Sequence, residues 1–286
     1  MKTIFQITIL LLFGAVLFQS CTKISDPYYT VKSVYVDTTK RSVLIEDYTG
    51  HLCVNCAPAA KIANTIQELY AGQAFVIAVH AGQFARPNPV QYPPYLEADY
   101  TCTAGNDWLA NSAFNIDGNP KGMVNRLPYK GNISFGPSEW NQAVQVATTL
   151  PKIAVMTVHN TFDAPTKMMN SKVDIKFLAG YTGTVNLTVC ILEDNIYGGQ
   201  LNIIKPDSVP IIKIFRFMHI LRGSLNTSFG EQVAINPKAQ DHISKTYSKN
   251  FSTETWIPAN CSVIAFISNS KTQEVLHVMK SPVIKP

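Results

Sequence analysis

The sequence predicts an α/β domain followed by an all-β sandwich, and two observations support this prediction. Up to about residue 150, short apolar runs alternate with segments whose apolar residues recur at helical spacing. Beyond that point, six or seven short strands are separated by Gly, Asn, Pro and Asp clusters, with no helical pattern between them. The change falls at Leu150-Pro151, and Pro commonly follows the end of a helix. We therefore divide the folded chain into residues 31–150 and residues 151–286.

The expected elements of the first domain follow from these patterns. Residues 42–48 and 74–80 are short apolar runs typical of strands, and residues 121–127 form a third candidate strand. Residues 57–70 and 137–149 carry apolar side chains at helical spacing. A long insertion, residues 81–105, contains four Pro and is followed by a short helix that Asn106 or Asp107 could cap.

The second domain is expected to contain strands alone. The predicted strands cover residues 153–158, 172–178, 184–192, 211–221, 247–252, 262–268 and 274–279. Cys190 and Cys261 lie on or beside two of them, either as buried free thiols or as a cross-strand disulfide.

Composition limits the functional class. The 286 residues are 46% hydrophobic and 15% charged, so the chain can bury a substantial core and is not a disordered protein. The net charge of +5 is spread along the chain without a basic cluster, so we expect no nucleic-acid partner.

The N-terminus predicts export and a lipid anchor. Residues 1–20 have a basic start and an apolar run, which is the pattern of a secretory signal peptide. Ser20 directly precedes Cys21, as in a bacterial lipobox, so we expect cleavage before Cys21 and lipidation of its thiol. Thr22, rather than an Asp, resembles the outer-membrane sorting pattern, and residues 21–30 form a tether. The alternative is ordinary secretion, with Cys21 an unmodified thiol.

The segment that carries chemistry is Cys53-Val54-Asn55-Cys56, between a predicted strand and a predicted helix. The unpaired N–H groups and positive dipole end of a helix N-terminus stabilise a thiolate. Cys53 is expected to be the exposed attacking thiol, with a pKa below about 8.5, and Cys56 the buried resolving thiol.

Two other interpretations of this pair remain open. The first is a static structural disulfide in an oxidising compartment. The second is a zinc site with ligands from His51, Cys53, Cys56 and Cys102, which the short spacing of His51 from Cys53 disfavours. We therefore predict no metal. His51, when protonated, could also lower the pKa of Cys53, or it could be an ordinary turn residue.

Two segments resemble thioredoxin. Residues 44–53 look like the thioredoxin strand that leads into its active-site turn, and Asp47 falls near the buried acid of that family. Glu46 is the alternative acid if the strand register differs by one. Residues 114–120 resemble the segment that ends in a cis-proline, which implies that Pro120, with the Asn119 backbone, helps to dock an extended partner peptide. Leu52, in place of Trp, departs from the thioredoxin pattern.

A second resemblance covers nearly the whole exported chain. Residues 48–56, 189–194, 219–223, 229–231 and 263–267 resemble the outer membrane protein twenty-eight family. These are envelope lipoproteins of anaerobic Gram-negative bacteria. The resemblance implies a thioredoxin-like α/β domain followed by an all-β immunoglobulin-like sandwich, at the cell outer membrane.

We expect thiol–disulfide exchange through Cys53 and Cys56, with Asp47 and Pro120 assisting. The partners would be protein thiols or disulfides of the envelope, together with the membrane through the lipid on Cys21. No nucleotide loop, Ser-His-Asp arrangement or paired-carboxylate motif competes, and no cofactor is expected. The alternative function is non-enzymatic surface binding, as in an adhesin, with the fold serving only as a scaffold.

Overall fold

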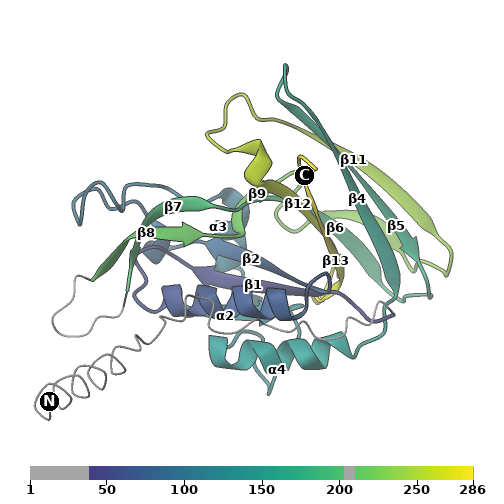
Figure 1. Cartoon of the computed structure of the whole chain (residues 1–286). Helices are drawn as coiled ribbons and strands as arrows, with labels where there is room; N and C mark the ends of the chain where they lie inside the picture. The colour runs from purple at the N-terminus through teal and green to yellow at the C-terminus, as the bar shows by residue number, and fades with distance from the viewer. Residues whose placement is uncertain (1–38, 203–209, 286) are drawn as a thin grey trace, which may run out of the picture. The chain divides into compact units, whose positions relative to one another are not determined.

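The computed structural model describes residues 39–202 and 210–285, all within one compact unit that spans Ser33–Pro286 (Figure 1). The predicted signal peptide, the tether and Cys21 lie outside the described residues. Among the described residues, no helix is long and apolar enough to cross a membrane.

The first elements follow the prediction closely. Strand β1 (Val43–Thr49) leads through a turn into helix α2 (Cys56–Leu69), and strand β2 (Ala74–His80) returns parallel to β1. Helix α2 buries Ala59, Ala63 and Ile66, which recur at helical spacing, against this pair of strands. All seven residues of β1 and of β2 are buried, as expected for strands covered on both faces.

The next segment holds four short elements and one longer helix. The helix α3 (Thr103–Ala110) begins earlier than predicted, because Cys102 rather than Asn106 or Asp107 caps it. Three further elements are the 3₁₀-helices η1 (Gln83–Ala85) and η2 (Ser112–Phe114) and the strand β3 (Lys121–Val124), which pairs antiparallel with β1. Helix α4 (Pro137–Thr148) starts at a Pro, whose fixed φ suits a first turn.

The remainder is almost entirely strand. It comprises β4 (Ala154–Asp163), β5 (Met168–Phe177), β6 (Thr184–Glu193), β7 (Ile196–Leu201), β8 (Ile211–Phe217), β9 (Ile220–Ser224), β10 (Glu231–Ile235), β11 (His242–Asn250), the 3₁₀-helix η3 (Pro258–Asn260), β12 (Cys261–Asn269) and β13 (Val275–Pro282). Strands β7 and β10 were not predicted, and the single strand expected over residues 211–221 is divided into β8 and the start of β9.

The strand pairing contradicts the predicted fold class. Strands from both halves of the chain form one mixed sheet in the order β13-β12-β6-β9-β2-β1-β3, with β10 paired to β6. The prediction of a thioredoxin-like α/β domain followed by a separate immunoglobulin-like sandwich is therefore wrong. The backbone explains the difference: Ala78 on β2 pairs with Ile220 on β9, so β9 covers a strand edge that an isolated α/β unit would leave open.

A continuous core lies along one face of this sheet. There, β1 and β2 share apolar contacts with β6, β9 and β12, for example among Leu44, Ile77 and Phe266. The opposite face is covered by α2 and α4 over β1 and β2, and by the β11-β5-β4 sheet over β6, β12 and β13 (Figure 1). This second sheet is the part of the predicted sandwich that the structure contains. The boundary predicted at Leu150-Pro151 stays a prediction.

Candidate functional site

The C-x-x-C segment lies where β1 passes into α2. The Cys53 N–H donates to the Gly50 carbonyl at 3.0 Å and the Cys56 N–H to the Cys53 carbonyl at 3.2 Å, so the turn is tightly wound. Cys53 and Cys56 are joined in a disulfide, with their Cα atoms 5.5 Å apart. The helix begins at Cys56, which places the pair at its N-terminus.

Both cysteines are buried. Cys53 is 3% exposed and Cys56 is 1% exposed, whereas Val54 between them is 40% exposed. The expectation that Cys53 is exposed does not hold in this disulfide-bonded form. For Cys53 to act as a solvent-facing attacking thiol, the residues that bury it would therefore have to move.

The hairpin of strands β7 and β8 packs against the turn that holds the two cysteines. The Gln200 side-chain amide donates to the carbonyls of Cys53 at 2.9 Å and Gly50 at 3.3 Å. The Leu201 N–H donates to the His51 carbonyl at 2.8 Å, so β7 runs beside the turn that carries the cysteines. Sequence reasoning missed this strand because Gly198-Gly199 interrupts its apolar pattern.

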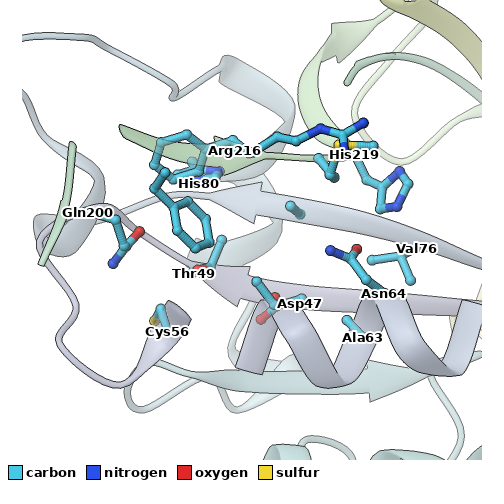
Figure 2. Close-up of a pocket in the computed structure, with 15 residues that line it drawn as sticks. Asp47, Thr49, Cys56, Ala63, Asn64, Val76, His80, Gln200, Arg216 and His219 are labelled. Atoms are coloured by element: carbon cyan, nitrogen blue, oxygen red, sulfur yellow. The ribbon is translucent and has the colours of Figure 1, made fainter. Parts of the chain in front are cut away.

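Asp47 points to the α2 side of the sheet. It lines a small cavity together with Cys56, and its Oδ1 atom has no hydrogen-bond partner among the described residues (Figure 2). Burial raises the pKa of Asp47 from 3.8 to about 7. Glu46, the alternative acid, points to the opposite face and binds Arg126 there, so the register places Asp47 beside Cys56.

Pro120 lies at the same end of β1. The Asn119–Pro120 peptide bond is cis, and the pairing of Tyr48 with Lys121 brings Pro120 level with the end of that strand. The two predicted substrate-binding residues therefore lie near the turn that carries the cysteines. Their role in docking a partner stays a prediction.

Two buried histidines border the site, and sequence reasoning assigned neither a firm role. Tyr100, from the insertion, contacts the rings of His51 and His80 at centroid distances of 5.6 and 5.4 Å, and Phe217 of β8 contacts His80 at 5.6 Å. Burial lowers the pKa of His51, so His51 is neutral at pH 7 and supplies no positive charge to Cys53. No sequence signal distinguished His80, a single His at the end of a buried strand.

The other described cysteines are free and separate from this pair. The Cys102 thiol accepts a hydrogen bond from the Gly105 N–H at 3.4 Å and caps α3. Burial raises the pKa of Cys102 and of Cys190, and raises the pKa of Cys261 to about 12, so none of the three is poised as a thiolate. Within the described ranges, no group of three or more His, Cys, Asp or Glu side chains is placed to hold a metal ion.

Comparison with known proteins identifies relatives. The sequence model of outer membrane protein Omp28 matches residues 109–285. The crystal structure of an Agrobacterium tumefaciens protein is similar in fold, with a TM-score of 0.54 and 11% identity over 87% of this chain and 98% of that one. A domain of the outer membrane lipoprotein Omp28 from Porphyromonas gingivalis matches with 21% identity and a TM-score of 0.31 over 46% of this chain and 88% of that domain. A search of curated proteins finds no significant match.

Proposed function

We propose that this chain, which belongs to the outer membrane protein Omp28 family, exchanges thiols and disulfides with proteins of the cell envelope. The protein is held at the outer membrane by a lipid anchor, as its N-terminal sequence predicted. The anchoring residue itself, Cys21, lies outside the described residues and stays a prediction.

One observation carries the proposal: Cys56 and Asp47 line the same cavity at the N-terminus of α2. A resolving thiol must lose a proton before it attacks a mixed disulfide. A buried carboxyl group with a pKa of about 7 accepts and returns a proton near neutral pH. The helix N-terminus favours the thiolate that attacks a substrate.

Exchange also requires access to Cys53. Because Gln200 and Leu201 bind the turn that holds Cys53, we propose that the β7–β8 hairpin moves aside before a partner reaches the disulfide. Such a motion breaks three hydrogen bonds at the turn, each of which contributes roughly 1 kcal/mol. An extended partner segment would then lie beside the cis Asn119–Pro120 peptide.

Trapping of mixed disulfides tests this function. In Cys56→Ser the resolving step is lost, so envelope proteins should remain bound to Cys53 and should be released by reductant. Cys53→Ser is the matched control and should trap none. The proposal is wrong if neither variant traps a partner and the wild-type disulfide resists reduction in a glutathione redox titration.

The burial of both cysteines favours a second candidate, a surface-binding protein with a structural disulfide. In that case both Cys→Ser variants would lose stability, by roughly 2–4 kcal/mol at most for so short a loop. Neither variant would form a covalent complex with a partner.

A further inference from the structure

A narrow cavity lies between α2 and the carboxyl ends of β1 and β2. Asp47 and Thr49 come to it from β1, Cys56 from α2, His80 from β2 and Gln200 from β7 (Figure 2). Its volume is about 20 Å³, and about 10–15 Å³ is enough to hold a water molecule. The cavity therefore fits one small polar molecule beside the resolving cysteine.

Three buried side chains that border this cavity have a polar atom without a hydrogen bond of normal geometry to any described residue. They are Asp47, through Oδ1, His80, through both ring nitrogens, and His219, through Nδ1 alone. An unsatisfied buried polar atom costs roughly 1–3 kcal/mol. A water molecule between Asp47 and His80 would satisfy both side chains, because water donates and accepts hydrogen bonds.

The two groups differ in what they can do with a proton. The pKa of Asp47 is raised to about 7 by burial, so its carboxyl group gains or loses a proton near neutral pH. The pKa of His80 is lowered to about 3, chiefly by burial, so its imidazole stays neutral at neutral pH. A neutral imidazole offers one donor and one acceptor. The rings of Tyr100 and Phe217 hold it in place.

The other basic side chains at the cavity lie against partners of their own. His219 Nδ1 lies 2.8 Å from Asp194 Oδ1, and its Nε2 lies 3.0 Å from the amide nitrogen of Gln67. Gln67 Oε1 in turn accepts the Val76 N–H, which fixes this amide orientation. Arg216 donates to Asn195 Oδ1. Among the described residues, His80 is thus the imidazole at this cavity with neither ring nitrogen in a hydrogen bond of normal geometry, although the Ala78 backbone lies within its reach.

We propose that His80 is a positioning residue for proton transfer at Cys56, and that it holds a water molecule against the Asp47 carboxylate. The inference rests on the proposed thiol–disulfide exchange. In the resolving step, Cys56 Sγ attacks Cys53 Sγ of the mixed disulfide. The Cys53–Cys56 bond forms, the bond to the partner sulfur breaks, and its electron pair leaves with that sulfur. The Cys56 proton passes through the water to Asp47, and solvent protonates the partner thiolate.

The test uses glutathione as the partner. The full-length protein is reduced, glutathionylated at Cys53 and followed for glutathione release across pH 5–9. His80→Phe keeps an aromatic ring against Tyr100 and Phe217 but cannot bind water. It should slow release by roughly tenfold, part of the hundredfold or more typical of proton-transfer groups. His80→Gln, which keeps a donor and an acceptor, should retain most of the rate. If His80→Phe does not fold, His80→Met replaces it with the same expectation.

The comparison with Asp47→Asn separates positioning from packing. If His80 acts through Asp47, the double variant should be no slower than Asp47→Asn alone, and both should lose the rise in rate near pH 7. Wild-type rates in His80→Phe at every pH, or multiplied losses in the double variant, would overturn the role of His80. Failure of the wild-type protein to release glutathione at all would instead overturn the proposed function.

Discussion

Arg126 and Glu46 form a two-point ion pair in the centre of the protein, where each side chain is 1% exposed. Arg126 Nε donates to Glu46 Oε2 at 2.9 Å, and Nη2 donates to Oε1 at 2.8 Å. The guanidinium carbon also lies 4.7–5.3 Å from the ring centres of Trp108, Phe114 and Phe266. The pair therefore joins β1 to α3, η2 and β12, which come from both halves of the sequence.

Removing one partner of this pair should be strongly destabilising. Arg126→Met keeps much of the volume but leaves the Glu46 carboxylate buried without its partner, which typically costs about 3–5 kcal/mol. Urea unfolding of the mature protein measures this loss. The double variant Arg126→Met/Glu46→Leu should recover much of it. Lys130→Met, which removes the exposed Lys130–Glu139 pair, is the control and should cost under about 1 kcal/mol. Similar small losses in both single variants would contradict this interpretation.

Local patterns were sufficient for the elements around the cysteines. The apolar run of β1 and the helical spacing of α2 depend on neighbouring residues, so the sequence predicted both to within one residue. Strand pairing is a long-range property, and no pattern in β2 or β9 indicated that Ala78 would pair with Ile220. The predicted fold class failed at that contact.

The site divides in the same way. Cys53, Cys56, Asp47 and the cis Asn119–Pro120 bond lie on or beside the strand–turn–helix unit and the strand next to it. The contact of Gln200 with Cys53 and the burial of Cys53 depend on a hairpin far along the chain, since Gln200 is 147 residues after Cys53. Such tertiary contacts cannot be predicted from the pattern of apolar and polar residues near either segment.

Asp47 should make stability fall as pH rises. Its folded-state pKa is about 7 against 3.8 for an ordinary Asp, so the folded protein holds a proton that the unfolded chain releases between these values. The stability that this proton provides is complete below pH 3.8 and is lost by about pH 7, a difference of roughly 4 kcal/mol. Asp47→Asn lacks this proton. The variant's advantage over wild type in urea unfolding should therefore grow from pH 4 to pH 8.

Histidines with a lowered pKa, which include His51, act in the opposite direction, and the shift is large in two of them. The pKa values of His80 and His277 are lowered to about 3 by burial, so their contribution is lost as pH falls below about 6.5. Both are present in wild type and in Asp47→Asn, so their own titration is common to the two proteins, and only the part that is coupled to Asp47 enters the difference. A difference that stays constant with pH would show that Asp47 is ionised in the fold.

Gln200 should control how fast the disulfide is reduced. Gln200→Ala removes the donors to the Cys53 and Gly50 carbonyls and should ease the opening of the hairpin. A loss of about 1.4 kcal/mol in local stability corresponds to about tenfold faster reduction by dithiothreitol. Tyr197→Ala, on the exposed part of the same strand, should leave the rate unchanged. Equal rates in the two variants would show that the hairpin does not limit access.

A substitution at Gly199 tests the same β7–β8 hairpin without altering any group that touches the cysteines. A Cβ at Gly199 would lie 2.6 Å from the Tyr95 carbonyl oxygen and 2.7 Å from the Tyr95 Cβ. The Tyr95 backbone cannot shift freely, because its carbonyl accepts the Gly199 N–H at 2.9 Å. Gly199→Ala should therefore push β7 away from the insertion and speed reduction of the disulfide. Gly118→Ala is the matched control, since a Cβ there meets nothing within 4 Å although the residue lies just before the cis Asn119–Pro120 bond. If both variants are reduced at the wild-type rate while Gly199→Ala is destabilised in urea, the hairpin stabilises the fold and a partner must reach Cys53 by another route.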